Sequence, residues 1–441
     1  NGQGFWGDSV DAPYNLVKYG KIDYLTLDYL AEVTLSIMQR QKIKNPEKGY
    51  ATDFVELFER IAVDISNKNI KVITNAGGVN PEICREKLLK IAKKLNLNIK
   101  IAIIKGDDIL RDMDSLISDG VDFSNMDDNS DFSSIKNKVY SANAYIDSFS
   151  IAEALSTDAD IVLAGRVSDP GLVLGPAIHE FNWKKTDYDK LAAGTLAGHI
   201  LECGAQCTGG NYSQWMEVPN IDKIGYPIAT LSDDTTFTIS KDPNSGGIIN
   251  KYTIIEQVLY EMGNPKKYIS PDVVVDFTSF DIKELSRDVV EVSGVKGYKD
   301  TNTYKVSINY FNGYKASGQL TVSGPDALEK AKLTSEIIWK RLERAGILFD
   351  DKLTEFLGFS SCHGQKIGKL KSKDDEVVLR LSVRDFNKEK IIRFSKELAP
   401  VITTGPPGIT GFSGGRPRPQ EIIAFWPCLI EKKHIKTKII A

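Results

Sequence analysis

The chain of 441 residues has few cysteines and no long apolar run, and each of these features argues against a class of protein. Five cysteines are an odd number in a long chain, which is typical of a reduced cytoplasmic protein rather than a disulfide scaffold. No stretch reaches the roughly eighteen consecutive apolar residues that a membrane-spanning helix needs. A formal net charge of only −3 gives no reason to expect nucleic acid as a partner. We therefore expect a cytoplasmic protein with neither a membrane nor a nucleic-acid partner.

What is present is an ordinary globular composition, 41% hydrophobic and 26% charged, in a chain longer than one core usually supports. In the first half, short β-type runs alternate with amphipathic helical runs, which predicts a mostly parallel, doubly wound α/β sheet. After about residue 225, period-two strands follow, and one of them pivots at Asn312 and Gly313, a pair that favours a hairpin. A helix at 326–344 and split β-α-β elements come next. We predict an α/β domain over residues 1–230 and a smaller α+β domain over residues 231–441.

Polar, glycine-rich turns follow the apolar runs repeatedly. The segment ADIVLAGRVSDP at 159–170 places Arg166 and Asp169 directly after a β-type run, and the turns within 2–8, 71–81 and 100–108 are built in the same way. Because the strand ends of a parallel sheet meet at one edge, we predict that these turns converge on one crevice. The candidate substrate-binding residues of these turns are Gly4, Gly7, Asn75, Gly77, Gly78 and Asp107.

Two of these turns have alternative interpretations. The glycines of the first turn have the G-x-G-x-x-G spacing of dinucleotide sites, but Phe5 and Trp6 fill the turn and Asp8 brings negative charge. A turn lining a substrate is therefore favoured over binding of NAD or FAD. The segment NAGGVNP at 75–81 is either a site for a carboxylate or phosphate or simply a tight turn.

Arg166 is the natural anion-binding side chain of the predicted crevice. It could grip a carboxylate while Asp169 orients it or acts as a base, or the two residues could pair with each other. The four carboxylates expected near strand ends could instead hold Mg²⁺, or shift one another's pKa so that one acts as acid or base; they are Asp28, Asp107, Asp108 and Asp169. A divalent metal stays an open alternative, and no other cofactor is certain.

His199, Cys203 and Cys207 recur every four residues within the predicted helical stretch at 191–207. On one helix face they would form a soft-metal site, or a thiolate nucleophile at Cys207 beside His199 as base. Gly204 and the later glycines argue against a helix that reaches Cys207, and the small residues nearby favour close packing.

The second half adds two glycine-rich turns. SGGIIN at 245–250 contains Gly246 ahead of a predicted helix and is a candidate anion turn. The loop at 403–417 carries regularly spaced glycines, among them Gly408, and contains Arg416 near its end. Such a loop can wrap a phosphate-bearing ligand such as a coenzyme A tail, or it can form a clasp between domains.

Eight segments together resemble one known family. They are GFWGD, DYLTLDYLAE, NAGGVNP, GDD, ADIVLAGRVSDP, ECGAQCTGGN, SGGIINKYTIIEQVLYEMGNPKKYISPDVVVDF and TTGPPGITGFSGGRP. They look like the acyclic terpene utilisation (AtuA-like) family over nearly the whole chain. The resemblance implies a part in acyclic terpenoid breakdown, beside acyl-CoA carboxylases, dehydrogenases and hydratases, with cleavage or hydration of a branched 3-hydroxyacyl-CoA as the reaction. Longer members carry a small ferredoxin-like C-terminal domain, so a separate small ferredoxin-like subunit is a candidate partner in a homo- or hetero-oligomer.

These observations lead to one hypothesis and one alternative. The hypothesis is a lyase or hydro-lyase acting on a branched or dicarboxylic acyl thioester, with a coenzyme A thioester as substrate. The residues expected to bind its carboxylate or thioester carbonyl are Asn75, Gly77, Gly78 and Arg166. Asp28 or Asp169 would move the proton, with His199 and Cys207 as further catalytic candidates. The alternative is a non-catalytic binding subunit that works with a small partner protein.

Overall fold

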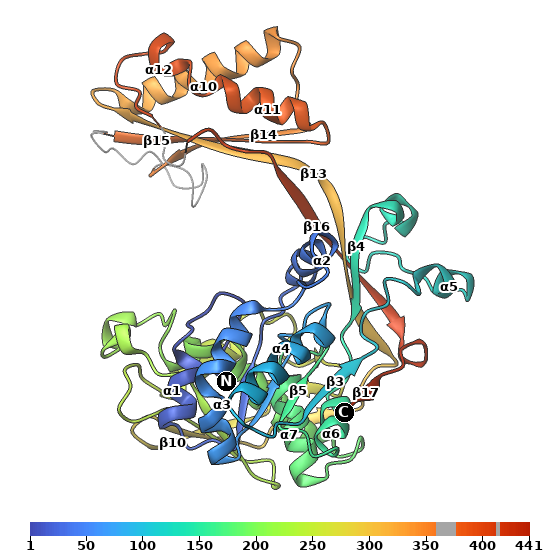
Figure 1. Cartoon of the computed structure of the whole chain (residues 1–441). Helices are drawn as coiled ribbons and strands as arrows, with labels where there is room; N and C mark the ends of the chain where they lie inside the picture. The colour runs from blue at the N-terminus through green and yellow to red at the C-terminus, as the bar shows by residue number, and fades with distance from the viewer. Residues whose placement is uncertain (359–375, 412–414) are drawn as a thin grey trace. The chain divides into compact units, whose positions relative to one another are not determined.

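The structure, a computed structural model, describes residues 1–358, 376–411 and 415–441 (Figure 1). The chain forms two compact units: residues 1–309 with 425–441 make up the first, and residues 310–424 make up the second. The boundary expected near residue 230 lies inside the first unit. The second unit is therefore an insertion in the chain of the first.

A five-stranded sheet in the order β1-β2-β5-β3-β17 forms the centre of the first unit (Figure 1). Its strands are β1 (Tyr24–Leu27), β2 (Lys71–Thr74), β5 (Ile161–Leu163), β3 (Ile101–Lys105) and β17 (Lys438–Ile440). The first four run parallel, and β17 pairs antiparallel with β3. The prediction of a mostly parallel sheet in an α/β protein is confirmed.

Helices cover both faces of this sheet. Alternate strand residues such as Leu25, Val72 and Ile103 share one core with α1 (Ala12–Tyr19), α3 (Thr52–Lys68) and α4 (Pro81–Lys94). On the other face, α6 (Phe149–Leu155) contacts β3 and β5, and α7 (Gly171–Phe181) contacts β1. Because both faces are buried, the strands read as nearly continuous apolar runs in the sequence.

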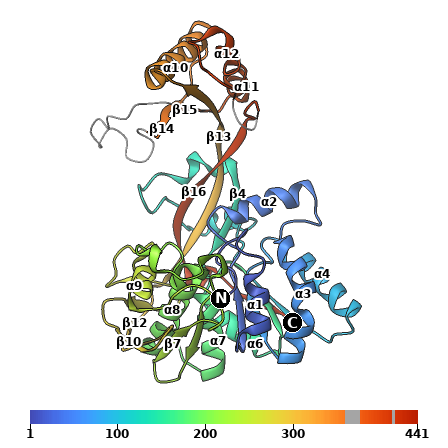
Figure 2. The same ribbon diagram turned by 90° about the vertical axis from the view of Figure 1, so that its left-hand side faces the viewer.

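The remainder of the first unit gathers around α8 (Tyr188–Glu202), as Figure 2 shows. One antiparallel sheet has the order β10-β11-β7-β6, and another has the order β12-β9-β8. Their strands are β6 (Ile228–Leu231), β7 (Phe237–Ser240), β8 (Tyr268–Ile269), β9 (Val274–Asp276), β10 (Asp281–Ser286), β11 (Val289–Ser293) and β12 (Lys296–Tyr298). The other elements of this unit are α2 (Thr34–Lys44), α5 (Met113–Ser118), β4 (Val139–Ala144) and α9 (Lys251–Leu259).

The second unit is built on the element order β13-α10-β14-β15-α11-α12-β16, with the sheet order β14-β15-β13-β16. Its elements are β13 (Thr303–Ser323), α10 (Ala327–Arg344), β14 (Asp351–Leu357), β15 (Glu376–Asp385), α11 (Lys388–Glu397), α12 (Val401–Thr404) and β16 (Gln420–Glu431). The start of β13, residues 303–309, and the end of β16, residues 425–431, belong to the first unit. A β-α-β-β-α-β order with this sheet order is the ferredoxin-like arrangement. Leu320, Ile338, Leu379 and Phe394 belong to its core. Among the described helices of both units, none is long and apolar enough to cross a bilayer.

The predicted hairpin at Asn312 and Gly313 is wrong, because β13 is one strand across these residues. The two-residue turn favoured by this pair needs both residues at positive φ. Here only Gly313 has a positive φ, of 94°, and from Tyr314 onward the strand pairs antiparallel with β15. The glycine therefore alters the course of the strand without reversing it. The helix predicted at 326–344 is confirmed as α10, which begins at Ala327.

Candidate active site

The polar turns after β1, β2, β3 and β5 are joined by hydrogen bonds at the carboxyl ends of these strands. Asn75 Nδ2 donates to Asp28 Oδ1 at 2.7 Å, and the Arg166 amide donates to Asp107 Oδ2 at 2.8 Å. The Arg166 guanidinium in turn reaches the turn after β1, donating from Nη1 to the Leu30 carbonyl at 2.8 Å. Residues spread over about 140 positions of the sequence thus form one cluster. We call it the strand-end cluster; its members are Asp28, Asn75, Asp107 and Arg166, with the neighbours that Arg166 contacts.

Asp28 is buried at the centre of the strand-end cluster. Its Oδ1 atom accepts hydrogen bonds from Asn75 Nδ2 and from the Leu30 amide, while Asn75 Oδ1 accepts from the Tyr29 amide at 2.7 Å. Both polar atoms of the Asn75 side chain are therefore used within the protein. Burial, followed by the nearby charge of Asp169, raises the pKa of Asp28 to about 7. A carboxyl group with this pKa exchanges its proton near neutral pH.

Arg166 links the buried part of the cluster to its exposed part. Its side chain is only 1% exposed, and Nη1 donates to Asp169 Oδ1 at 2.7 Å, where the Asp169 side chain is 43% exposed. Nη2 donates to the Tyr145 hydroxyl at 3.1 Å, and the guanidinium carbon lies 4.3 Å from the centre of that ring. Burial alone would lower the pKa of Arg166, but Asp169, Tyr145 and Asp28 raise it well above its usual value. Of the two alternatives, the structure contains the pairing of Arg166 with Asp169.

Asp107 supports the turn that carries Arg166. In addition to the Arg166 amide, its Oδ2 atom accepts a hydrogen bond from Asn143 Nδ2 at 2.9 Å, and burial raises its pKa. A Cβ atom at Gly165 would lie 2.2 Å from Asp107 Oδ1. Only glycine at position 165 allows the carboxylate to approach this closely, so both residues maintain the geometry of the turn.

The glycines of the first two turns are in close packing, apart from Gly7. A Cβ atom at Gly77 would lie 2.8 Å from Pro81 Cβ, and one at Gly78 would lie 2.2 Å from Met38 Sδ. Gly4 donates its amide to Asp8 Oδ2 at 2.9 Å, and its Cβ position lies 3.0 Å from the Glu202 carbonyl oxygen. Gly7 has a φ of 106° with open space around its Cβ position. The first turn therefore packs on the end of α8.

The end of α8 packs beside the turn that carries Asp169. A Cβ atom at Gly198 would lie 2.5 Å from the Pro170 carbonyl oxygen, so the helix packs directly on the residue after Asp169. His199 Nδ1 lies 2.9 Å from Glu202 Oε1, and both side chains are buried. Burial raises the pKa of Glu202, and the charge of Asp169 raises it further. Burial lowers the pKa of His199, but Glu202 more than offsets this and leaves it raised.

Cys207 lies outside the helix that carries His199. The helix ends at Glu202, and Cys207 belongs to the 3-10 turn Gly204–Thr208, which confirms the expectation from Gly204. Burial raises the pKa of the Cys207 thiol to about 12, so it stays protonated at neutral pH. Within the described residues, no three His, Cys, Asp or Glu side chains are grouped as metal ligands.

The candidate residues of the second half have contacts of their own. A Cβ atom at Gly246 would lie 2.0 Å from the Asn220 carbonyl oxygen, and the first amide of the following helix α9 donates to Glu284. That helix start is therefore already occupied by a carboxylate of the chain. Gly408 and Arg416 belong to the second unit, where the Gly408 carbonyl accepts from the Ser323 amide and Arg416 is exposed. Residues 412–414 of their loop lie outside the described residues.

Two contributors to the strand-end cluster were missed from the sequence. Tyr145 contacts Arg166 directly, and Asn143 holds Asp107; both belong to the segment of β4 and its end. The signal was present in the short run VYSANAY, but its small and polar residues do not read as a strand. The β4 residues are recognisable only once their pairing with β13 is known.

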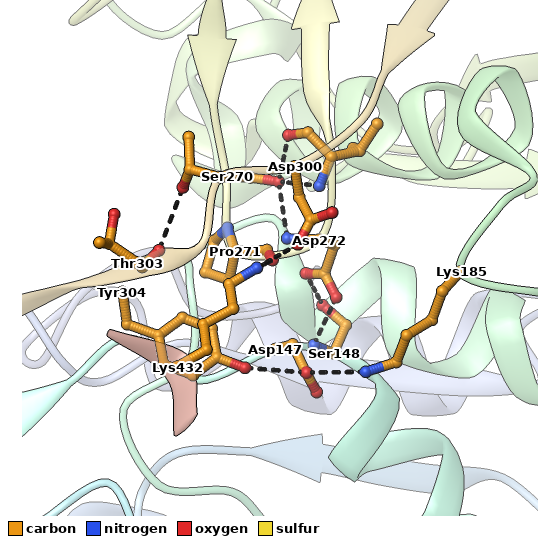
Figure 3. Close-up of polar contacts among 12 residues, drawn as sticks. Asp147, Ser148, Lys185, Ser270, Pro271, Asp272, Asp300, Thr303, Tyr304 and Lys432 are labelled. Atoms are coloured by element: carbon orange, nitrogen blue, oxygen red, sulfur yellow. Dashed lines mark hydrogen bonds and ion pairs between the residues drawn. The ribbon is translucent and has the colours of Figure 1, made fainter. Parts of the chain in front are cut away.

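A second polar cluster of the first unit is drawn in Figure 3. Asp272 is buried and accepts hydrogen bonds from the amide and the hydroxyl of Ser148, both at 2.8 Å. Burial, followed by the charge of Asp147, raises the pKa of Asp272 to about 7. Lys432 forms an ion pair with Asp300 in the same cluster. Lys432, which also donates to the Pro271 carbonyl, thus links residues 425–441 to the rest of the first unit.

The fold and this geometry define an α/β protein with two carboxylates around a buried arginine at the strand ends of its parallel sheet. The sequence matches the model of the acyclic terpene utilisation family protein AtuA over residues 1–441, and the chain belongs to this family. Membership implies a role in acyclic terpene utilisation. No curated protein and no solved structure matches the chain.

Proposed function

We propose that this chain is a lyase or hydro-lyase acting on a branched or dicarboxylic 3-hydroxyacyl thioester, with Asp169 as the base. One observation carries the proposal: Arg166 is buried and holds the exposed Asp169, while Asp28 is buried behind them with its pKa raised to about 7. Burial thus brings the proton exchange of Asp28 close to neutral pH, while Asp169 is the exposed partner of the same arginine. The family's role in acyclic terpene utilisation supports a substrate from the breakdown of acyclic terpenes.

The three side chains take distinct roles in this proposal. Asp169 is the carboxylate that solvent and substrate can reach, so it is the catalytic residue. Arg166 orients Asp169 through the bond at 2.7 Å and is a positioning residue, because its own side chain is buried. Asp28 changes the charge beside Arg166 when it gains or loses a proton near neutral pH, and it acts through that pair.

The proposed proton transfer balances for both reactions. In the lyase, Asp169 removes the proton of the 3-hydroxyl group, and the bond between C2 and C3 breaks. A carbonyl forms at C3, the electron pair passes to C2 as the thioester enolate, and the proton returns to C2. In the hydro-lyase, Asp169 removes a C2 proton, a double bond forms between C2 and C3, and the C3 hydroxyl leaves as water with the proton that Asp169 gives back. Each route needs one exposed base that is held in place, which Asp169 provides.

The test is an assay of the whole chain with 3-hydroxy-3-methylglutaryl-CoA, which is branched and carries a free carboxylate. Products are followed by mass spectrometry for cleavage and by ultraviolet absorbance for an unsaturated thioester. We expect Asp169→Asn to lower kcat about 10²-fold to 10⁴-fold, because a positioned base contributes that much. Asp169→Asn also removes the carboxylate that pairs with the buried Arg166, so the unfolding temperature should fall too, and kcat is compared at a temperature where both proteins are folded.

Asp158→Asn is the matched control, because Asp158 is exposed and pairs only at the surface with Lys100. It should retain full activity. Turnover that survives Asp169→Asn would overturn the proposal. Binding of the thioester without any turnover would also overturn it, in favour of a binding subunit.

A further inference from the structure

Lys305 lies at the start of β13, beside the strand-end cluster, and both belong to the first unit. Its backbone carbonyl accepts a hydrogen bond from the Tyr145 amide at 2.9 Å, and its ammonium nitrogen lies 5.2 Å from the centre of the Tyr145 ring. The hydroxyl of the same tyrosine accepts a hydrogen bond from Arg166. One aromatic ring thus neighbours two cations, Arg166 and Lys305.

The face of β13 that carries Lys305 packs on the turn after β1. Alternate residues of a strand share one face, so Lys305 and Asn309 are on the same side of β13. Asn309 Nδ2 donates to the Glu32 carbonyl at 2.8 Å, and the Leu30 carbonyl of the same turn accepts from Arg166. This face of β13 and the Arg166 guanidinium therefore meet at one turn of the candidate active site.

The charge of Lys305 is not neutralised within the described part of the chain. Its half-buried side chain has neither an ion pair nor a hydrogen bond from its ammonium there, and the ammonium lies over the rings of Tyr145 and Phe425, at 5.2 and 5.3 Å. Arg166, by contrast, pairs with Asp169 at 2.7 Å. Aromatic faces attract a cation without cancelling its charge. Of the two cations, Lys305 is therefore the one that can still pair with an anion from outside the chain.

The donors at this position indicate which kind of anion fits. A phosphate group is held best by several donors together, such as a guanidinium fork or the amides at the start of a helix. Lys305 offers one compact ammonium, which matches a single carboxylate. Arg166 and Lys305 lie 4.3 and 5.2 Å from the centre of the same ring, so their cationic groups are no farther apart than these two distances combined. A short dicarboxylic chain can span that separation, with its hydroxyl at Asp169 and its free carboxylate at Lys305.

We propose that Lys305 binds the free carboxylate of a dicarboxylic acyl thioester and thereby selects this substrate over a thioester whose acyl chain ends in a methyl group. The inference rests on the proposed function, because it assumes a thioester that reacts at Asp169. It narrows the substrate class from branched or dicarboxylic to dicarboxylic. Arg166 stays paired with Asp169 and takes no part in this recognition.

The probes are glutaryl-CoA and pentanoyl-CoA, which have acyl chains of equal length and differ in the terminal carboxylate. Neither has the 3-hydroxyl group that the proposed reaction needs, so calorimetry on the whole chain measures binding alone. We expect the wild type to bind glutaryl-CoA about tenfold to a hundredfold more tightly, as for a hydrogen bond between charged groups. Lys305→Met should abolish this preference and leave the dissociation constant of pentanoyl-CoA unchanged. Lys283→Met, the same substitution at an exposed residue of β10, is the control and should keep the preference.

The outcomes separate this inference from the proposed function. A wild type that binds the two thioesters equally, or binds neither, would overturn the role of Lys305, and so would a preference that survives in Lys305→Met. An equal loss of affinity for both thioesters in folded Lys305→Met would place the lysine at the phosphates of coenzyme A and would overturn it as well. A preference that depends on Lys305, together with turnover of 3-hydroxy-3-methylglutaryl-CoA that survives Asp169→Asn, would overturn the proposed chemistry and leave the role of Lys305 standing.

Discussion

At the residue scale, one buried cation connects the parts of the candidate site. The Arg166 guanidinium contacts the Leu30 carbonyl, the Tyr145 hydroxyl and the Asp169 carboxylate, and the Arg166 amide is held by Asp107. A buried charge is costly unless it is paired and hydrogen-bonded, and these contacts supply both conditions. Replacing Arg166 would therefore perturb the fold more than the chemistry.

Asp28 should make the stability of the protein depend on pH. Its folded pKa is about 7, whereas an unfolded aspartate has a pKa of 3.8. The folded state therefore binds this proton more tightly than the unfolded state does. The stabilisation that results is fully present below pH 3.8 and is lost as the pH rises through 7. In Asp28→Asn the amide stays neutral at every pH, so the variant does not lose this stabilisation as the pH rises. We expect the free energy of unfolding of the variant, relative to wild type, to grow between pH 4 and pH 8, by at most about 4 kcal/mol.

Denaturant titrations at pH 5, 6, 7 and 8 measure this difference. Asp158→Asn is the control, because the hydrogen bond from Lys100 lowers the pKa of Asp158 and gives no such growth. Curves of wild type and Asp28→Asn that stay parallel over this range would show that Asp28 titrates as an ordinary carboxyl group.

Gly165 should be intolerant of even one added methyl group. In Gly165→Ala the new Cβ atom would lie 2.2 Å from Asp107 Oδ1, so the carboxylate must withdraw from the Arg166 amide. We expect the free energy of unfolding to fall by about 1–3 kcal/mol, as measured by urea denaturation. Gly263→Ala is the control, because nothing lies within 4 Å of its Cβ position. Equal stability of the two variants would contradict the packing described for this turn.

At the scale of elements, the site depends on how α8 meets the turn after β5. Glycine at 198 lets the helix approach the Pro170 backbone, and the same helix continues to His199 and Glu202. The helix therefore both contacts the turn of Asp169 and carries the pair His199 and Glu202. Small residues along α8 look like general close packing in the sequence, and the structure shows that one of them serves this particular contact.

Gly198→Ala should impair activity more than stability. The added Cβ atom would lie 2.5 Å from the Pro170 carbonyl oxygen. The Pro170 backbone can move away only if the adjacent Asp169 moves with it. A displacement of a catalytic group by about 1 Å can cost about 10²-fold in rate, so we expect kcat to fall at least tenfold. Gly194→Ala on the same helix is the control, because its Cβ atom meets side-chain atoms of Leu174 and Trp183. Similar rates for the two variants would remove this role from Gly198.

Part of the fold and part of the site could be predicted from the sequence. Parallel strands followed by polar turns were readable because the apolar runs are short and the turns carry glycine and aspartate. The hairpin at Gly313 was not, because the sequence does not reveal that Asn312 keeps a negative φ. The role of Asn75 as a partner of Asp28 was also out of reach, since it depends on which strands are neighbours in the sheet.

At the scale of the whole molecule, the chain contains two units with separate cores. Leu379 is fully buried in the core of the second unit, which does not include the strands of the parallel sheet. We expect Leu379→Ala to destabilise that unit by about 2–5 kcal/mol. Hydrogen exchange should accelerate in α10, α11 and β15, while the amides of β2 and β5 stay protected. Equal acceleration in both units would show that they unfold as one.

The position of β17 sets an order for the synthesis of the protein. This strand pairs with β3, and more than 300 residues, including the entire ferredoxin-like unit, separate the two in the chain. While the chain emerges from the ribosome, the β3 edge of the parallel sheet must stay open until residues 438–440 have been made. The inserted unit, whose residues are complete earlier, can form its own core first. Nascent chains should therefore expose that sheet edge to chaperones until residues 438–440 have left the ribosome.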